Sequence, residues 1–560
     1  MRSRRGPPSF HLFYSLRHAM LARVATIVLA SAATFAHGAT IDVERRDAFT
    51  DCLSNGSPSG AVVTPSSSNY GSARAAFNQR LSFKPAALVF PSSPQDVQKY
   101  VKCAASAGVA VVARSGGHSY AAYGVGGQDG ALVVDLSKMK SFSIDSSGAA
   151  KIQSGGCSLR WSFVGGQDGA LVVDLSKMKS FSIDSSGAAK IQTGNRLGEV
   201  AQKLWDNGQR ALPHGTCPYV GSGGHAAFGG YGPYSRVAGL LHDRITAAEV
   251  VLANGTLTTA STSQNADLFW AFQNADLFWA LRGAGASYGI VTQWTFATLA
   301  APTTVIGYSI DYSSTLSASK IAGLLNAWQS LAMSAPKEMA MIAVVGPDGD
   351  GGLYLQFTGD YYGYKSSFNS VTSNWASKLS PGKITSKTYN WYDSLVATDG
   401  PLSVTSPGPK DTFFAKSLFT KQAVTSSQWT SFLNYLNNEG ANSDTDWFVE
   451  IDLYGGQITS QGADSTSFAH RDAILSFQLY ANSKNLQPPF PSDGVSFVNG
   501  MLNALEPNPR AAYVNYVDPT LTDSQWKTQY YGSRYSRLSS IKRAVDPNNV
   551  FRFPQSIGLN

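Results

Sequence analysis

Val111-Val-Ala-Arg-Ser-Gly-Gly-His-Ser-Tyr120 is a short apolar strand that runs into a polar turn with two glycines and a histidine. Gly116 and Gly117 allow the backbone to approach another group closely because they carry no Cβ atom. A strand that feeds such a loop commonly brings main-chain N–H groups against a phosphate or a ring system. His118 would then lie beside the bound group. The alternative is a surface turn with an incidental histidine, which so short a motif does not exclude.

Length and composition predict a globular protein of more than one domain. A chain of 560 residues is too long for one small core, and 43% hydrophobic with 14% charged residues is typical of folded proteins. The 25 Tyr, 28 Phe and 11 Trp residues suit a sugar-binding or ring-binding surface, but they also suit any large core. Five of the seven net positive charges lie in residues 1–39. The remainder has no basic excess that would indicate a nucleic-acid partner.

Residues 1–39 have the pattern of a secretion signal. Basic residues precede an apolar run, Ala25–Phe35, and small residues follow it. The run is shorter than the roughly 20 apolar residues of a membrane span, and no later segment is long enough. Met20 is an alternative start. The sequence therefore predicts a secreted protein without a membrane anchor, with glycosylation acceptors at Asn55 and Asn254.

The four cysteines indicate one disulfide and two residues of open role. In an oxidising compartment Cys52 and Cys103 would join the mature N-terminus to the first domain. Cys157 and Cys217 remain, and a bond between those two stays open as an alternative, although their sequence settings differ.

A βαβ unit surrounds the opening motif. Ala87–Phe90 predicts a strand, Ser93 is an N-cap followed by Pro94 at the first helical position, and Gly108 ends the helix. Val109–Ala113 predicts the next strand. The glycine-histidine loop then lies at the end of a strand, where α/β sheets usually bind their ligands.

Two segments are duplicated without a single change. Val125–Gln153 recurs as Val164–Gln192, and Gln264–Ala271 recurs as Gln273–Ala280. Structural repeats diverge in sequence and recur several times. These two duplications therefore indicate an error of gene model or assembly, or a very recent duplication. The joint between the long copies contains Cys157, to which we assign no role.

The sequence changes character at about Ala300. Strands are expected over Met339–Val345 and Leu353–Gly359, and helices near Ala318–Met333 and Ser426–Asn438. This mixture predicts a second, α+β domain built on an antiparallel sheet.

Five motifs follow one another in a fixed order: Arg114–Tyr120, Pro213–Cys217 with Gly221–His225, Leu281–Ile290, Tyr513–Tyr516 and Asp546–Asn549. Together they resemble the berberine-bridge-enzyme-like branch of the vanillyl-alcohol-oxidase flavoprotein superfamily. Within that branch the chain is most similar to the fungal glucooligosaccharide and chitooligosaccharide oxidases. The resemblance extends from about Phe49 to Ile557, outside the duplicated segments.

The resemblance implies an α+β fold with a two-part FAD-binding domain of the vanillyl-alcohol-oxidase type. Its parts would be residues 84–299 and a C-terminal segment, 506–560. A substrate domain with a large antiparallel sheet flanked by helices would lie between them, over 300–505. Residues 40–83 would form an N-terminal segment after the signal at 1–39.

The resemblance also implies FAD linked twice to the protein. His118 would bond the 8α carbon of the flavin through a ring nitrogen, and Cys217 would bond carbon 6 through sulfur. Two links would fix the ring and make it a stronger oxidant. The two residues are 99 positions apart, or 60 when one 39-residue copy is removed, and the shorter spacing resembles doubly linked relatives. The alternative for Cys217 is a buried free thiol. The other residues expected to bind FAD are Arg114, Ser115, Gly116, Gly117, Ser119, Gly221, Gly223, Gly224, Gly289 and Ile290.

By the same resemblance, Tyr516 is the catalytic base and Asp452 assists it. Hydride removal from a carbinol carbon requires a group that takes the hydroxyl proton. A tyrosine with a pKa near 10 is a weak base at neutral pH, so a carboxylate that shares the proton is expected. Tyr120 and Gln478 are expected to bind the sugar. The alternative for Tyr516 is an aromatic residue packed on the sheet.

These expectations describe a secreted, monomeric FAD-dependent oxidase. It would oxidise the reducing-end C1 hydroxyl of an oligosaccharide to a lactone and pass the electrons to O₂, giving H₂O₂. No metal site is expected, because the spacing of His214, His225 and His470 fits no ligand pattern. One alternative is a flavin oxidase of a secondary metabolite. Another is a flavin-free binding protein, or an inactive product if the duplications are real.

Overall fold

The computed structural model describes residues 47–123, 131–135, 170–174, 178–261, 268–312, 315–404, 409–506 and 510–560. The chain divides into two compact units, residues 1–56 and residues 57–560. In the first unit residues 47–54 are helical. Cys52 and Cys103, which the sequence predicts to form a disulfide, are both disulfide-bonded. The predicted signal, residues 1–39, and Cys157 lie outside the described residues.

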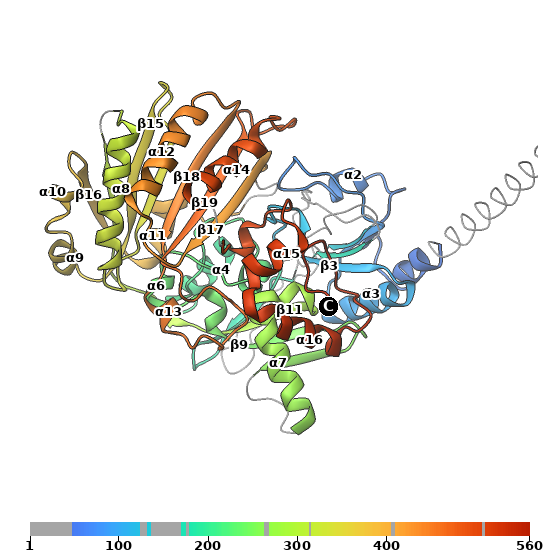
Figure 1. Cartoon of the computed structure of the whole chain (residues 1–560). Helices are drawn as coiled ribbons and strands as arrows, with labels where there is room; N and C mark the ends of the chain where they lie inside the picture. Colours follow the sequence, from blue (N-terminus) through green and yellow to red (C-terminus); the bar gives the residue numbers. More distant parts are fainter. Residues whose placement is uncertain are drawn as a thin grey trace, which may run out of the picture. The chain divides into compact units, whose positions relative to one another are not determined.

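The opening motif follows a strand of a five-stranded sheet (Figure 1). The strands lie in the order β1 (Val62–Val63), β2 (Ala87–Val89), β5 (Ala170–Asp174), β3 (Ala110–Arg114) and β4 (Ala131–Asp135). Strands β2 and β3 both pair in parallel with β5, as a βαβ unit requires. The predicted βαβ unit is therefore confirmed.

Helix α3 (Pro94–Ala107) connects β2 to β3 and begins and ends where the sequence predicts. The Ser93 hydroxyl accepts a hydrogen bond from the Asp96 backbone N–H at 3.1 Å, and the Asp96 carboxylate accepts one from the Ser93 N–H at 2.9 Å. This reciprocal pair satisfies two N–H groups that the first helical turn leaves free. Gly108 ends the helix with φ of +69°, which favours glycine.

Both copies of the 29-residue duplication contribute a strand to this sheet. Val111 of β3 lies opposite Leu132 of β4 and also opposite Leu171 of β5, so the two copies pair with β3 in the same register. Strand β5 pairs with β2, β3 and β4, although a strand has only two edges. The two copies thus present the same residues to β3 in the same register, so either copy alone could supply this strand.

Removal of one 39-residue copy should therefore preserve the fold and raise Tm by a few degrees. Deletion of residues 125–163 and deletion of residues 154–192 give the same product, which connects β3 to its neighbour by a shorter loop. Shortening a loop about threefold lowers its closure cost by roughly 1 kcal/mol. Differential scanning calorimetry measures the change. A chain that lacks both copies is the control and should not fold, whereas a lower Tm for the single deletion would contradict this account.

The second copy also supplies two strands of a second sheet, which is antiparallel. Its order is β10 (Leu257–Ser261), β9 (Ile245–Val251), β11 (Ile290–Ala297), β7 (Ala188–Gln192) and β6 (Phe181–Ile183). Strands β9 and β10 form a hairpin around Asn254 and Gly255, a residue pair that favours such turns. Strand β11 begins at Ile290, after a turn of 3₁₀-helix formed by Gly285–Ser287.

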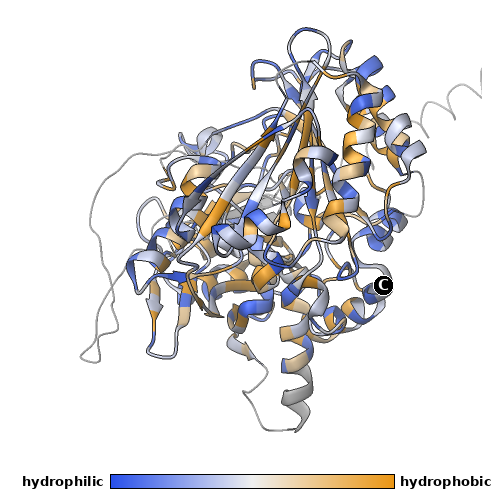
Figure 2. Cartoon of the chain, turned by 90° about the vertical axis from the view of Figure 1, so that its left-hand side faces the viewer, coloured by the Kyte–Doolittle hydropathy of each residue, from blue (hydrophilic) through white to orange (hydrophobic). Residues whose placement is uncertain are grey.

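The later part of the chain forms a seven-stranded antiparallel sheet. Its order is β16 (Lys383–Tyr389), β13 (Val305–Asp311), β15 (Leu353–Tyr362), β14 (Ile342–Pro347), β18 (Thr445–Leu453), β19 (Leu475–Ser483) and β17 (Phe413–Thr420). Helices α8 (Ala318–Met333), α12 (Ser426–Gly440) and α14 (Gly494–Leu505) cover one face and share a core with it (Figure 1). Figure 2 shows hydrophobic residues gathered on the strands and on the helix sides toward them. The predicted α+β class with a large antiparallel sheet is confirmed.

The strand expected over Met339–Val345 is displaced. It runs over Ile342–Pro347, and Met339 forms only an isolated bridge to Tyr361. Alternation of apolar residues does not mark the strand ends here, because Met339, Ala340 and Met341 are all buried.

The remaining elements are short or connect the sheets. They are α2 (Tyr70–Ala73), α4 (Leu197–Asp206), α5 (Ser222–Ala227), α6 (Ser235–Ala238), α7 (Leu268–Ala284), α9 (Lys365–Val371), α10 (Trp375–Lys378), α11 (Trp391–Asp399), α13 (Gln457–Ser460), β8 (Arg210–Ala211) and β12 (Leu299–Ala300). Helix α7 includes the second copy of the eight-residue duplication, whose Leu277, Phe278 and Trp279 are buried. Residues 264–267 of the first copy lie outside the described residues.

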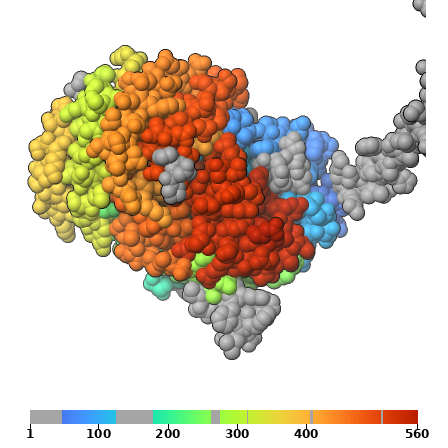
Figure 3. Space-filling model, in the orientation of Figure 1, coloured from blue at the N-terminus to red at the C-terminus, as the bar shows by residue number. Residues whose placement is uncertain are grey.

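The last fifty residues return to the first half of the molecule. They contain α15 (Asp523–Trp526) and α16 (Tyr535–Val545) and share one core with the second sheet (Figure 3, red). The fully buried Lys542 amine donates to the Asp546 carboxylate at 2.6 Å and to the Ser287 and Phe551 carbonyls at 2.7 Å each. The Val111 N–H, on β3, donates to the Val550 carbonyl at 2.8 Å. The C-terminal segment is thus bonded directly to the strand that carries the opening motif.

Candidate active site

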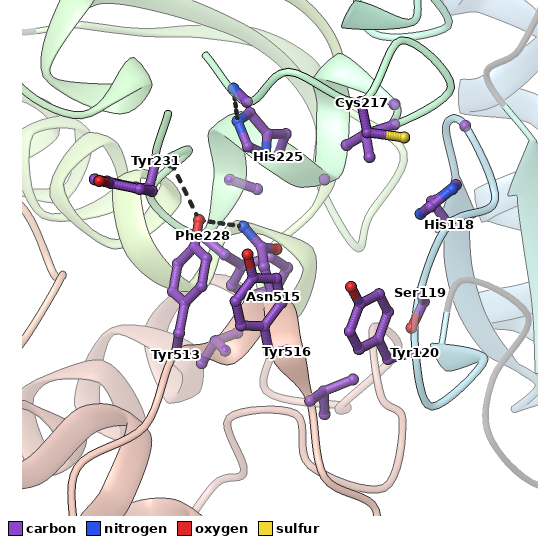
Figure 4. Close-up of a pocket in the computed structure, with 18 of the residues that line it drawn as sticks. His118, Ser119, Tyr120, Cys217, His225, Phe228, Tyr231, Tyr513, Asn515 and Tyr516 are labelled. Atoms are coloured by element: carbon purple, nitrogen blue, oxygen red, sulfur yellow. Dashed lines mark hydrogen bonds between the residues drawn. The ribbon is translucent and has the colours of Figure 1, made fainter. Parts of the chain in front are cut away.

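A cavity of about 600 Å³ lies where three parts of the chain meet. The loop after β3 and the segment around α5 line one side, the site-facing residues of β14, β15, β18 and β19 line another, and residues 513–517 complete it. Figure 4 shows His118 and Cys217 around the same space as Tyr120 and Tyr516. Residues that the sequence separates by up to four hundred positions are therefore neighbours here.

Most of the predicted site residues line this cavity. Those that do are Arg114, Ser115, Gly116, Gly117, His118, Ser119, Tyr120, Cys217, Gly221, Gly223, Gly224, Gly289, Asp452, Gln478 and Tyr516. Ile290 does not; it is 1% exposed in the core of β11, and Val291 lines the cavity in its place. The prediction for Ile290 followed the motif, whereas alternation along a strand lets only every second residue face one side.

Two glycine-rich segments touch backbone to backbone at one end of the cavity. A Cβ atom on Gly116 would lie 2.4 Å from the Gly221 nitrogen, and one on Gly221 would lie 2.1 Å from the Gly116 nitrogen. The Gly223 N–H donates to the Ser115 hydroxyl at 3.2 Å, which holds the two segments together. The lack of side chains at these two glycines therefore allows the two segments to pack backbone against backbone at the cavity.

The His118 imidazole is buried and neutral. It stacks on Phe77 with ring centroids 3.8 Å apart, and its Nε2 atom has no hydrogen-bond partner among the described residues. Burial, followed by the positive charge of Arg196, lowers the pKa of His118 to about 3. The ring therefore keeps a free lone pair at neutral pH, which makes it a nucleophile.

Cys217 is a free cysteine on the same cavity and is partly exposed. Burial of the sulfur raises the pKa of the thiol, and the Asp399 carboxylate raises it further, while a hydrogen bond from the Tyr219 backbone lowers it. The sulfur is therefore a thiol rather than a thiolate in the folded protein. No bond to Cys157 is described, since Cys157 lies outside the described residues.

Tyr516 is delivered by a short 3₁₀-turn, Val514–Tyr516. Its ring stacks on Tyr120 with centroids 5.5 Å apart and an interplanar angle of 14°. The turn is anchored by the Tyr513 hydroxyl, which accepts a hydrogen bond from the Gly230 N–H at 3.0 Å. The same hydroxyl accepts hydrogen bonds from the Tyr231 N–H at 3.3 Å and the Asn515 amide at 2.8 Å (Figure 4). Burial, followed by the Glu450 charge, raises the pKa of the Tyr516 phenol above its ordinary value.

Asp452 and Glu450 both reach the cavity from β18. Asp452 is 3% exposed, and burial followed by the Glu450 charge raises the pKa of its carboxyl well above the ordinary value. Burial, followed by the Asp399 charge, raises the pKa of Glu450 to about 7. Both carboxyl groups therefore tend to hold protons near neutral pH.

The two residues expected to bind a sugar bind each other. The Gln478 side-chain amide donates a hydrogen bond to the Tyr120 hydroxyl at 2.6 Å, and both residues line the cavity. Tyr120 also has its pKa raised, by burial first and then by Glu450. A polar amide and a flat aromatic ring are thus held side by side, which suits a sugar ring with hydroxyl groups.

Several lining residues have no predicted role. They include Tyr123, His225, Phe228, Tyr231, Asp399 and Glu450. Glu450 stands two positions before Asp452. Because side chains two positions apart in a strand point to the same face, the sequence carried a signal that Glu450 lies beside Asp452. His225 accepts a hydrogen bond from the Gly215 N–H at 3.0 Å, although sequence reasoning considered it only as a metal ligand.

These residues fit FAD. The orphaned His118 nitrogen, the free Cys217 thiol and the glycine contact at Gly116 and Gly221 all border one cavity. In the part of the chain that the structure describes, no group of three or more His, Cys, Asp and Glu residues is arranged to hold a metal ion. No helix among the described residues has both the length and the apolar character to cross a membrane.

Comparison with known proteins defines the class. A model described as "FAD binding domain" matches residues 85–157 and 152–261, and one described as "Berberine and berberine like" matches residues 512–558. The first model matches twice, once for each long copy of the duplication. These two domains are those of FAD-linked oxidases.

Relatives that align over nearly their whole length identify the family within this class of oxidases. The chain is 32% identical to a chitooligosaccharide oxidase of Gibberella zeae, over 92% of this chain and 95% of that one. It is 32% identical to a xylooligosaccharide oxidase of Thermothelomyces thermophilus, over 96% and 99%. A solved glucooligosaccharide oxidase from Acremonium strictum, described with 6-S-cysteinyl, 8α-N1-histidyl FAD, matches with a TM-score of 0.77 and 28% identity, over 92% and 99%. The chain belongs to the berberine-bridge-enzyme-like family of FAD-linked oxidases.

Proposed function

We propose that the protein oxidises the reducing-end C1 hydroxyl of oligosaccharides to a lactone and passes the electrons to O₂, which yields H₂O₂. The observation that carries the proposal is that the Tyr516 phenol and the Asp452 carboxyl line the same cavity as His118 and Cys217. A proton acceptor is thereby placed beside the residues expected to hold the flavin. The similarity to relatives named as oligosaccharide oxidases supports a sugar as substrate.

The cavity walls suit a sugar. The Tyr120 and Tyr516 rings provide flat apolar surfaces, and Gln478 offers an amide that is fixed by its bond to Tyr120. Thr398 and Asp399 of α11 are exposed and also line the cavity. They mark an opening through which the rest of an oligosaccharide chain could extend toward solvent.

Proton removal is assigned to Tyr516 and Asp452. The C1 hydroxyl proton passes to the Tyr516 oxygen as the Tyr516 proton passes to a carboxylate, so that no free phenolate is required. Burial makes the phenolate costly, as the raised pKa of Tyr516 shows, and this favours a linked transfer. Bound FAD supplies the hydride acceptor and the route of the electrons to O₂.

We further propose that His118 and Cys217 each form a covalent bond to the flavin. His118 is neutral and its Nε2 atom lacks a partner among the described residues, as a nucleophile requires. The Cys217 thiol borders the same cavity and is not consumed by a disulfide. Arg114, Ser115 and the paired glycines would hold the remainder of the cofactor through main-chain and buried polar groups.

We also propose that the protein is secreted and acts as a monomer. Disulfide-bonded Cys52 and Cys103 suit an oxidising compartment, and so does the signal pattern of residues 1–39. Size-exclusion chromatography of the protein from culture medium tests both points.

Peroxide release tests the activity. Flavin-loaded protein should release H₂O₂ with cello-, malto-, xylo- or chito-oligosaccharides, in an amount equal to the aldonic acid formed. The same sugars reduced to alditols are the matched control, because they lack the anomeric carbon and should give no peroxide. Absence of peroxide with every sugar would contradict the proposal and favour a secondary metabolite as substrate.

A further inference from the structure

Two carboxyl side chains share one face of β18 at the cavity. Glu450 and Asp452 are separated by one residue, so both point to the same side of the strand, about 7 Å apart along it. On the adjacent strand β14, Val344 lies opposite Glu450 and Ile342 lies opposite Asp452. The two carboxyl groups therefore face apolar side chains on that flank.

The opposite flank offers no charge either. On β19, Gln478 lies opposite Glu450 and Ser476 lies opposite Asp452. The Gln478 amide is engaged with Tyr120. Burial and neighbouring negative charge raise the pKa values of both carboxyl groups. Among the described residues, none donates a hydrogen bond to either group.

The ionisable groups around the pair are acids or phenols. They are Asp399 from α11, Tyr120 from the loop after β3, Tyr231, Tyr454 after β18, and Tyr513 and Tyr516 from the C-terminal segment. The cation Arg236 acts on Tyr231 rather than on either carboxyl group. Its guanidinium is already bonded to the Met339 carbonyl at 2.7 Å. In this setting two adjacent carboxylates cannot both be ionised at low cost.

We propose that Glu450 and Asp452 act as one carboxyl pair that holds a single proton near neutral pH. Glu450 is then a positioning residue for the reaction: its charge controls when Asp452 can accept the proton of Tyr516. The inference rests on the proposed function, because it assigns Asp452 the role of proton acceptor. It adds Glu450 as the residue that controls proton acceptance by Asp452, and it predicts how the reaction rate responds to pH.

The carboxyl pair loses its two protons in separate steps as pH rises. When both carboxyl groups are protonated, Asp452 has no site for a proton and Tyr516 keeps its own. Loss of the first proton leaves one negative charge on the pair, mostly on Glu450, whose pKa is about 7. Asp452 loses its proton at higher pH, because Glu450 is by then negative. Oxidation therefore accelerates as pH rises through the second dissociation.

The Glu450→Gln variant tests whether the Glu450 charge controls the ionisation of Asp452. Without the neighbouring negative charge Asp452 ionises more easily, so the acid limb of kcat/KM should move to lower pH by roughly one to two units. A residue with a merely structural role would change the rate but not the position of this limb. An acid limb that stays in place, or that moves to higher pH, overturns the proposal.

Asp446→Asn is the matched control. Asp446 lies on the same strand and the same face, four positions from Glu450, but it is exposed and does not line the cavity. Its removal deletes the same charge outside the site, where solvent screens it. The pH profile of this variant should coincide with that of the wild-type protein, and a shift equal to that of Glu450→Gln would overturn the local coupling.

An infrared titration of the full-length flavoprotein tests the pair without turnover. Difference spectra record the C=O band of protonated carboxyl groups as pH rises. Asp360, whose pKa burial also raises to about 7, should give one step that is the same in both proteins. Beyond that step, the wild-type protein should lose two such groups in separate steps, and Glu450→Gln should lose the remaining one at lower pH than the second wild-type step. If no sugar is oxidised, the proposed function fails while this titration still decides the coupling. The coupling is overturned if the remaining group of Glu450→Gln loses its proton at the same pH as in the second wild-type step.

Discussion

A Tyr516→Phe variant is expected to oxidise sugar about 10³-fold more slowly than the wild-type protein, with little change in KM. Phenylalanine keeps the ring that stacks on Tyr120 at 5.5 Å but removes the hydroxyl that takes the C1 proton. Substrate binding should therefore persist while the chemical step fails. The measurement is the rate of flavin bleaching after sugar is mixed with the protein under anaerobic conditions.

Tyr364→Phe is the control for this comparison. Tyr364 is 74% exposed at the start of α9 and does not line the cavity, so loss of its hydroxyl should leave the rate unchanged. Asp452→Asn should slow flavin bleaching as well, because the amide cannot accept the Tyr516 proton. If the rate of flavin bleaching in Tyr516→Phe falls by less than about tenfold, the C1 hydroxyl proton has another acceptor, and Tyr516 has only a packing role.

Replacement of both residues that we propose to link the flavin, His118 and Cys217, should abolish covalent attachment altogether. His118→Ala and Cys217→Ala should each retain one bond to the flavin, so that yellow colour stays with acid-precipitated protein in both. The double variant should release all of its flavin on precipitation. The reason is geometric: His118 and Cys217 border one cavity from separate loops, so each can bond the flavin without the other.

Peptide mass spectrometry identifies the attachment site in each single variant. His470→Asn is a suitable control, since His470 is also buried with an unpaired ring nitrogen among the described residues but does not line the cavity. Its flavin should remain fully attached. Complete loss of attached flavin in either single variant would show that one bond is needed before the other forms, and unchanged attachment in the double variant would exclude both residues.

Local signals predicted much of the first domain. Ser93, Pro94 and Gly108 marked helix α3 because capping groups act within a few residues and leave a direct trace in the sequence. The hairpin of β9 and β10 was predictable for the same reason. The beginning of β11 was not, because the 3₁₀-turn before it depends on packing against distant residues.

The candidate site required the resemblance to known flavoproteins. His118 and Cys217 lie in separate loops, and Tyr516 and Asp452 lie hundreds of positions beyond them, so no local pattern joins the four. Glu450 was visible in the sequence, but its effect depends on Val344 and Ile342 from another strand, which make its surroundings apolar. The Lys542 contacts could not be predicted, because Ser287 approaches only after the chain has folded back.

The return of the C-terminal segment to β3 also sets an order of events during biosynthesis. Val550 bonds to Val111, and Lys542 holds Ser287, so the segment that carries Tyr516 docks only after nearly the whole chain has left the ribosome. The flavin pocket therefore stays open on one side throughout translation. Maturation into an oxidase must wait until α16 and Val550 have been synthesised and docked, and nascent chains interrupted before α16 would be unable to mature.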